Sequence, residues 1–374
     1  MEKLLFCAPT MFGLEGIARD ELKRMGMQNV AAEEGRVLFE GELSDAATAL
    51  VRLRTAERVQ IVAADFAARS FDDLFEGVKA VEWERFIPKG CAFPVRGHCV
   101  DSTLMSVPDC TSIIRKAIAV RLGAKYHTER LDESRGERRI RFTILRDRAI
   151  VHVDLAGDPL YKRGYRTQSG EAPLRETLAA GLVLMMPWFG REPFRDPMCG
   201  SGTIALEAAM IAKNRAPGLM RRFSLEAWEG GERMIADAKE LARAKEFSRE
   251  YNIAGSDIDP EVVELARSNA RRAGLDGTVR FEVADAREFS YQAEKGCVVC
   301  NPPYGVRLGD GIEAADLIKR FGAAMREKPN WCCGILTADP ELEQWYGVKA
   351  GKRRRMYNGM IQCTYYRFLP NKRG

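Results

Sequence analysis

The spacing of hydrophobic residues changes near residue 160, which indicates at least two kinds of folding unit in one chain. Before that point, short strand-like runs are interleaved with stretches whose hydrophobic residues recur every three or four positions. Few long βαβ units appear there, so the pattern predicts small α+β modules rather than one Rossmann sheet. We expect strands at residues 4–8, 37–39, 59–63, 92–99, 140–145 and 150–155, and helices at 12–25, 43–50, 71–78 and 111–122, the last capped by Asp109 or Thr111.

From about residue 190, strands and helices follow one another in regular alternation, which is typical of an open parallel sheet in an α/β fold. Strands are expected at residues 193–196, 281–284 and 297–300 and in a segment that ends at Asp257. Helices are expected at residues 174–186, 203–213 and 261–273, with Gly274 as the C-cap of the last one. The connection between Lys213 and Ile253 is unusually long, and it holds Trp228 and a helix of many charges.

Length and composition agree with a globular protein of more than one domain. Of 374 residues, 46% are hydrophobic and 30% are charged, which excludes a disordered chain, a collagen-like repeat and a coiled-coil rod. The amino terminus has no basic, strongly apolar leader, and the longest apolar run, residues 178–190, is too short to span a bilayer. We therefore expect a cytoplasmic protein with ten reduced and mostly buried cysteines, and no metal site at Cys297-x-x-Cys300.

The net charge of +5 is unevenly distributed along the chain. Residues 1–110 hold 13 basic against 18 acidic residues, residues 111–148 hold 11 against 5, and residues 349–374 hold eight basic residues and no acid. Basic clusters of this kind suit contacts with a phosphate backbone, although a solvated surface of mixed charge gives the same pattern. The candidate nucleic-acid contacts are Arg115 and Lys116 on an expected helix, Arg139 and Arg141 on one face of an expected strand, and Arg353 and Arg354.

Polar residues stand at the ends of four expected strands, where an α/β sheet binds its ligands. They are Asp196, which opens Asp196-Pro-Met-Cys-Gly-Ser-Gly202, and then Asp257, Asp285 and Asn301. A single Asp in such a place is often only a helix N-cap, but three in succession favour a shared ligand.

The glycines of the first turn fit a dinucleotide fingerprint only formally. Its acidic residue is expected about 20 residues further on, whereas Asp257 lies much further away, and Asp196 would repel a pyrophosphate. S-adenosylmethionine suits the site better, because it carries an ammonium and a sulfonium and no phosphate. The candidate cofactor-binding residues are Asp196, Pro197, Cys199, Gly200, Ser201, Gly202, Thr203, Asp257, Ile258, Asp285, Ala286 and Asn301.

The tetrapeptide Asn301-Pro302-Pro303-Tyr304 holds the candidate catalytic residues Asn301, Pro302, Pro303 and Tyr304. Its two prolines donate no backbone hydrogen bond and hold the turn rigid, which leaves the Asn301 side-chain oxygen and the Pro302 carbonyl as fixed acceptors. Two acceptors suit an exocyclic amino group with two N–H donors, and Tyr304 offers a face on which a base can stack. Only three histidines occur, the last at His152, so a histidine base in the second half is excluded.

Six segments carry a more specific signal: residues 172–180 (APLRETLAA), 196–203 (DPMCGSGT), 216–218 (APG), 255–259 (GSDID), 300–305 (CNPPYG) and 357–359 (YNG). Together they resemble the bacterial THUMP-domain class I RNA guanine-N2 methyltransferases, which include the N-terminal unit of the bifunctional 23S rRNA enzyme and its stand-alone relatives. The resemblance covers residues 165–365 closely and the earlier residues loosely. It implies a ferredoxin-like segment at 1–60, a THUMP RNA-binding domain at 61–163 and a Rossmann-like, S-adenosylmethionine-dependent methyltransferase domain at 164–374.

The resemblance further implies methyl transfer to guanine N2 in RNA, with 23S rRNA as the first candidate. In that reaction Asn301 and Pro302 would accept both amino protons and aim the nitrogen at the methyl group, while Tyr304 would stack on the extruded base. No strong base is needed, because the proton can leave after the nitrogen has become cationic. Three alternatives stay open: a tRNA substrate, an adenine-N6 or cytosine-N4 DNA methyltransferase, and an RNA-binding assembly factor without activity.

Overall fold

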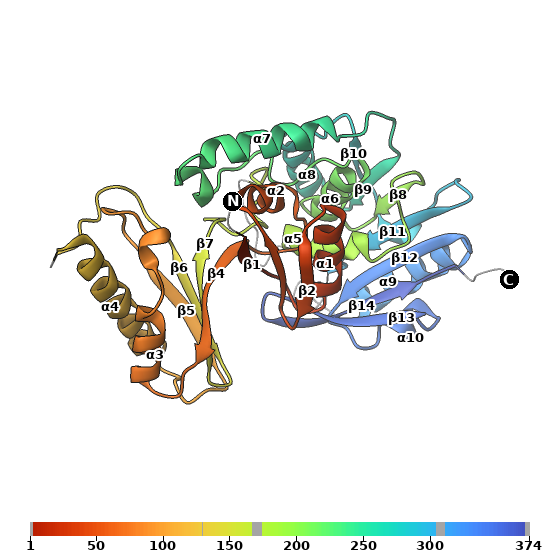
Figure 1. Ribbon diagram of the computed structural model, residues 1–374. Helices are drawn as coiled ribbons and strands as arrows, with labels where there is room; N and C mark the ends of the chain where they lie inside the picture. Colours follow the sequence, from red (N-terminus) through yellow and green to blue (C-terminus); the bar gives the residue numbers. More distant parts are fainter. Residues whose placement is uncertain (1–2, 129, 167–173, 304–310, 371–374) are drawn as a thin grey trace.

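The computed structural model describes residues 3–128, 130–166, 174–303 and 311–370. Two seven-stranded sheets organise the chain, one in each half (Figure 1). The first sheet has the order β2-β3-β1-β4-β7-β6-β5 and is antiparallel except for the pair β5 and β6. Its strands are β1 (Leu4–Pro9), β2 (Gln28–Glu33), β3 (Arg36–Gly41), β4 (Gln60–Ala67), β5 (Val95–Val100), β6 (Ile140–Leu145) and β7 (Arg148–Asp154).

Four helices accompany the first sheet: α1 (Glu15–Arg24), α2 (Leu43–Arg52), α3 (Phe71–Lys79) and α4 (Val107–Tyr126). Helices α3 and α4 lie together over the end of the sheet that is far from the second half of the chain (Figure 1). All the strands and helices expected before residue 160 are present. The expected modules at 1–60 and 61–163 nevertheless share one continuous sheet, because β1 pairs with β4 across that boundary. The boundary between them therefore stays a prediction.

Two details of the first half differ from the sequence-based expectation. Strand β2 was not expected, because nearly all of its side chains are exposed and it therefore lacks the alternation that a half-buried strand shows. Helix α4 begins at Val107 rather than Thr111, and its N-cap is Ser106 rather than Asp109 or Thr111. The Ser106 hydroxyl accepts a hydrogen bond from the Asp109 backbone N–H, and Pro108 fits the first turn because that turn leaves backbone N–H groups unpaired.

The second sheet has the order β10-β9-β8-β11-β12-β14-β13, with five parallel strands followed by an antiparallel hairpin. This confirms the expected open α/β sheet. The strands are β8 (Phe194–Asp196), β9 (Ile253–Asp257), β10 (Val279–Val283), β11 (Gly296–Cys300), β12 (Trp331–Thr337), β13 (Lys352–Asn358) and β14 (Ile361–Phe368). The helices are α5 (Glu176–Leu184), α6 (Thr203–Ala212), α7 (Gly231–Ala244), α8 (Pro260–Ala273), α9 (Gly311–Arg326) and α10 (Leu342–Tyr346).

Strand β11 is buried on both faces, as a central parallel strand must be. Cys297 and Val299 pack into the core with α5, α6 and α8, whereas Val298 and Cys300 pack on the other side with α9. The C-x-x-C is therefore strand interior. All ten cysteines are described and none forms a disulfide; all but Cys99 are buried.

Each half of the chain contributes side chains to the hydrophobic core of the other. Leu14, at the start of α1, packs in the core of the second half, where Gly181 leaves room for it: a Cβ there would lie 2.5 Å from the Leu14 Cδ2 atom. In return, α7 from the long connection after Lys213 packs on α2 and contributes Ile235 to the core of the first half. Gly218 sits against the Val51 backbone, whose carbonyl accepts its N–H at 2.9 Å. The long connection thus fixes how the two halves are joined.

A buried ion pair strengthens this junction. The Arg163 guanidinium lies 3.2 Å from the Glu207 carboxylate of α6, and it also donates to the Arg54 carbonyl from the first half. Both side chains of the pair are almost completely shielded from solvent. Removing one partner of such a pair costs about 3–5 kcal/mol, because the remaining charge is left unpaired in the interior. The halves are therefore held as one unit.

Within the described ranges, no helix is long and apolar enough to cross a membrane. The same residues contain no cluster of three or more His, Cys, Asp or Glu side chains with the spacing to hold a metal ion.

Candidate active site

The direction in which the chain adds strands reverses between β8 and β11. From β8 the chain continues to β9 and β10 on one side, and it then returns to β11 and β12 on the other. Ligands of open α/β sheets bind at the carboxyl ends of the strands at such a reversal. Asp196 is the last residue of β8 and Asn301 directly follows β11, so these two predicted site residues lie at the same edge of neighbouring strands.

Asp196 is a buried carboxylate without a partner. Only 1% of its surface is exposed, and neither carboxylate oxygen has a hydrogen-bond partner among the described residues. Burial raises the pKa of this carboxyl well above its usual range, repulsion by the nearby Asp257 raises it further, and only the Met198 backbone N–H acts in the opposite direction. An unpaired buried carboxylate is costly, so the site is suited to a ligand that brings a cation.

Hydrogen bonds from two other elements fix the position of the turn after β8. The Gly200 N–H donates to the Asp257 carboxylate at 2.9 Å, and the Asn269 side-chain amide of α8 donates to the Ser201 carbonyl at 2.9 Å. Among the described residues, no atom lies within 4 Å of a Cβ placed on Gly200, which leaves space above the turn. Gly202 has no such space, because a Cβ there would lie 2.7 Å from the Phe281 ring. Its backbone is also left-handed, with a φ of +84°.

Gly202→Ala is expected to lower the free energy of unfolding by about 2–4 kcal/mol, through left-handed backbone strain and the clash with Phe281. Because Gly202 is also the residue from which α6 starts, the variant should bind S-adenosylhomocysteine more weakly as well. Urea unfolding and calorimetric titration measure the two effects. Gly277→Ala is the matched control, since a Cβ there meets open space. Equal stability of the two variants would contradict this account of the turn.

The other two strand-end aspartates are already hydrogen-bonded. Asp257 accepts from the Gly200 N–H and, through its second oxygen, from the Asp259 N–H at 3.3 Å. Asp285 caps the short helix at Ala286–Glu288, and its hydrogen bond with the Arg287 guanidinium is the main reason why its pKa is lowered. Both therefore do the capping that single aspartates often do, and both stay at the edge where a ligand is expected.

The apolar candidates at this edge differ in exposure. Ile258, directly after β9, exposes 60% of its surface, whereas Ala286 is almost fully buried. A large exposed aliphatic side chain beside a polar strand end offers a surface that an aromatic ring can cover. Three further candidates are buried: Pro197 and Cys199 in the turn, and Thr203 at the start of α6.

Asn301 repeats the situation of Asp196 on the neighbouring strand. Its side-chain oxygen is buried and has no hydrogen-bond partner within the described part of the chain. Pro302 is buried and Pro303 is half-buried, whereas Tyr304 lies outside the described residues. Burial is the main cause of the raised pKa of Cys300, the last residue of β11. The charge of Asp196 also contributes to it, because the two strand ends lie close together. Two side chains with unpartnered buried oxygens thus lie at adjoining strand ends.

Sequence reasoning missed Asn269 and Phe281. Asn269 is fully buried on α8, and Phe281 supports both Gly202 and Gly255. The signal for Asn269 was a polar residue on the otherwise apolar face of α8 that holds Val263, Ala266 and Ala270. No pattern in the sequence marks Phe281, because a hydrophobic residue in a strand is expected whether or not it supports a turn.

The candidate nucleic-acid contacts fall into two groups. Arg115 and Lys116 are exposed on α4. The other four are held by the protein itself: Arg139 pairs with Glu137, Arg141 with the buried Asp154, and Arg353 with Glu343, while Arg354 donates to the Gly13 carbonyl. Through the pairing of β12, β14 and β13, Arg353 stands level with Cys300, three strands across the sheet. The role of all six in binding stays a prediction.

The strand order, the five parallel strands with an antiparallel hairpin, and the ligand edge at β8 and β11 define a class I methyltransferase domain. Three family models match the chain: the RlmL ferredoxin-like domain at residues 5–60, the THUMP domain at 68–154, and the RMKL-like methyltransferase domain at 163–367. The chain therefore belongs to the RMKL-like methyltransferase family, as the resemblance implied.

Relatives of known name agree with this assignment. The chain is 39% identical over 377 residues to the Bacillus subtilis protein named "Putative RNA methyltransferase YpsC", covering 100% of this chain and 98% of that one. It is 35% identical over 382 residues to the ribosomal RNA large subunit methyltransferase K/L of Psychromonas ingrahamii, covering 99% of this chain and 51% of that one. The crystal structure of SMU.472 complexed with SAH matches with a TM-score of 0.94 and 36% identity, covering all of both chains.

Proposed function

We propose that this protein transfers a methyl group from S-adenosylmethionine to the exocyclic N2 of guanine in RNA, with 23S rRNA as the first substrate to test. Membership of the RMKL-like family makes it an S-adenosylmethionine-dependent methyltransferase, and its THUMP domain makes RNA its substrate. The rRNA assignment rests on similarity to the large subunit methyltransferase K/L. The observation that carries the proposal is the set of three unpartnered buried oxygens, two on Asp196 and one on Asn301, at adjoining strand ends.

The residues at the ligand edge fit S-adenosylmethionine. Asp196 would pair with its ammonium group, which supplies the cation that the buried carboxylate lacks. Asp257, held at the edge by the Gly200 N–H, would accept hydrogen bonds from the ribose hydroxyls. Ile258 and Ala286 would contact the adenine, with Asp285 beside it. The free space above Gly200 lets the ligand approach the turn closely.

Asn301 and Pro302 would act on the target amino group rather than on the cofactor. When bound, S-adenosylmethionine supplies a methyl group on a sulfonium, which is a good leaving group. The Asn301 side-chain oxygen and the Pro302 carbonyl would accept hydrogen bonds from the two N–H groups of guanine N2. They would thereby point the nitrogen lone pair at the methyl group. As the N–C bond forms, the S–C bond breaks; the cationic nitrogen then releases one proton to water. The absence of a histidine in this half of the chain agrees with that scheme.

Deleting the gene and measuring nucleosides tests the proposal directly. Loss of N2-methylguanosine from one fragment of 23S rRNA, and its return when the intact gene is restored, is the expected result of nucleoside mass spectrometry. Restoring the Asn301→Ala gene instead is the matched control, and it should leave the modification absent. Loss from tRNA alone would move the substrate to tRNA. An unchanged N2-methylguanosine content together with loss of N6-methyladenine from DNA would replace the proposal by the adenine alternative.

A further inference from the structure

A groove lies at the edge of the catalytic sheet opposite the ligand edge. We call it the amino-edge groove, because its residues directly precede the amino ends of β8 and β9; they are Phe189, Arg191, Glu192, Glu246, Phe247, Ser248 and Arg249. Its volume is about 920 Å³. Asp196 and Asp257 stand at the carboxyl ends of the same two strands, which at about 3.3 Å per residue places the groove roughly 10–17 Å away from the ligand edge. The groove is therefore separate from the methyl-transfer site.

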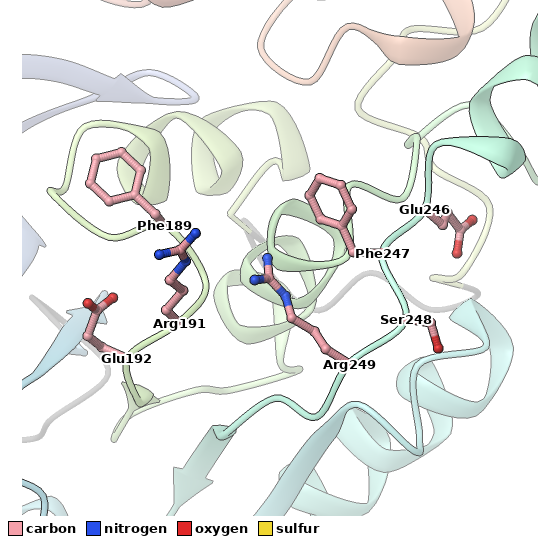
Figure 2. A pocket seen from close by; sticks show the side chains of 7 residues that line it. All are labelled: Phe189, Arg191, Glu192, Glu246, Phe247, Ser248 and Arg249. Carbon is pink, nitrogen blue, oxygen red and sulfur yellow. The ribbon is translucent and has the colours of Figure 1, made fainter.

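Two phenylalanine rings flank this groove. Phe189 exposes 77% of its surface and Phe247 exposes 50%. Figure 2 shows the two rings with the guanidinium groups of Arg191 and Arg249 between them, while the carboxylates of Glu192 and Glu246 point away. Large aromatic side chains are normally buried, so two exposed rings at one groove mark a binding surface.

The lining of the groove holds two arginines and two glutamates, and both glutamates pair with cations outside it. Glu246 pairs with Arg215 at 3.3 Å, and Glu192 lies 3.5 Å from the Lys295 ammonium. Among the described residues, neither Arg191 nor Arg249 has a carboxylate partner. The Arg249 guanidinium lies 5.2 Å from the centre of the Phe247 ring and 5.5 Å from that of the Tyr251 ring, and it donates a 3.5 Å hydrogen bond to the Ala212 carbonyl. The two arginines of the groove therefore keep their charge for an anionic ligand.

We propose that the amino-edge groove binds a single-stranded segment of the RNA substrate. Bases stack on Phe189 and Phe247, and phosphates pair with Arg191 and Arg249. Exposed aromatic rings interleaved with arginines suit unpaired nucleotides, because a duplex hides the faces of its bases. This inference rests on the proposed function in taking RNA as the ligand, and it adds a contact surface remote from the methylated base.

Fluorescence anisotropy with a labelled 12-nucleotide oligouridine, on the full-length protein, tests the groove. Phe189→Ala/Phe247→Ala should weaken binding about 5- to 150-fold per lost stack without changing the salt dependence. Arg191→Glu/Arg249→Glu should make the negative slope of log affinity against log salt shallower by at least about 1.4. That is the value for two single-strand phosphate contacts. Ultraviolet cross-linking of the wild-type complex should map to Phe189 and Phe247.

The controls match each change in chemistry. Arg222→Glu/Arg233→Glu reverses two cations that are more than 80% exposed, and Leu241→Ala removes an exposed apolar side chain on α7. These variants should bind oligouridine like the wild type, and all variants should bind S-adenosylhomocysteine normally. Three results would each overturn the inference: unchanged affinity in both groove variants, equal competition by duplex RNA, or altered self-association in place of altered RNA binding. Because none of these measurements requires methylation, failure of the guanine-N2 assignment would leave their outcome unaffected.

Discussion

Asn301→Ala is expected to reduce the rate of methyl transfer about 10²-fold while S-adenosylhomocysteine still binds. The buried side-chain oxygen of Asn301 has no partner in the described structure, so its removal leaves no described donor unsatisfied. What is lost is the acceptor that aligns the target amino group, and misalignment of a reacting group by as little as 1 Å can cost about 10²-fold. Single-turnover methylation of RNA and calorimetric titration with S-adenosylhomocysteine measure the two quantities.

Asn301→Asp serves as the conservative control, because it keeps an acceptor oxygen at the same place. It should therefore retain more activity than the alanine variant. The thermal stability of Asn301→Ala should stay close to that of the wild type, which separates a role in orientation from a role in folding. Full activity of Asn301→Ala would remove Asn301 from the reaction and with it the proposed use of the tetrapeptide.

Asp196→Asn is expected to weaken S-adenosylhomocysteine binding at least about 30-fold and, at the same time, to stabilise the ligand-free protein at neutral pH by about 1–3 kcal/mol. The binding loss follows because the ligand's ammonium would be buried without its counter-ion. The gain in stability follows because the wild-type carboxyl is buried without a partner and has a raised pKa. A group with a raised acid pKa binds protons more tightly in the folded state than in the unfolded state.

The pH dependence fixes the sign of this effect. Below the pKa of about 3.9 that an unfolded Asp has, both states are protonated and the wild type and variant should be equally stable. As the pH rises above that value, the unfolded wild type loses its proton first and the native state becomes progressively less stable, up to the raised native pKa. Urea unfolding between pH 4 and 8 should therefore show a difference that grows with pH. Ligand binding should release protons from the wild type, which titrations in buffers of different ionisation enthalpy detect.

The matched control is Asp285→Asn, for which the stability of the protein should change in the opposite direction. The Arg287 guanidinium lowers the pKa of Asp285, so its ionised form stabilises the native state above the unfolded pKa. That stabilisation is lost as the pH falls through the native pKa, and at neutral pH the Asp285→Asn variant should be less stable than the wild type, not more. If Asp196→Asn and Asp285→Asn shifted stability in the same direction, the buried carboxylate would have a partner that the structure does not show.

Much of the catalytic half could be predicted from sequence because its signals are local. Strands of a parallel sheet are short hydrophobic runs, and the residues that follow them meet at one edge whatever the rest of the chain does. Asp196, Asp257, Asp285 and Asn301 were found in this way. Elements with weak patterns were missed: β2 is exposed along nearly its whole length, and the choice of Ser106 as N-cap depends on where α4 packs.

Local patterns in the chain were enough to predict most elements up to Cys300, the strand ends that carry polar residues, and the rigid turn at Asn301, because spacing and proline chemistry act over a few residues. Which of those residues lack a partner depends on the folded arrangement. Asp257 and Asp285 are hydrogen-bonded by Gly200 and Arg287, whereas Asp196 and Asn301 are left unsatisfied. The amino-edge groove likewise unites Phe189 and Phe247, which are far apart in sequence. Burial and partnership depend on contacts between distant segments, and no local pattern records them.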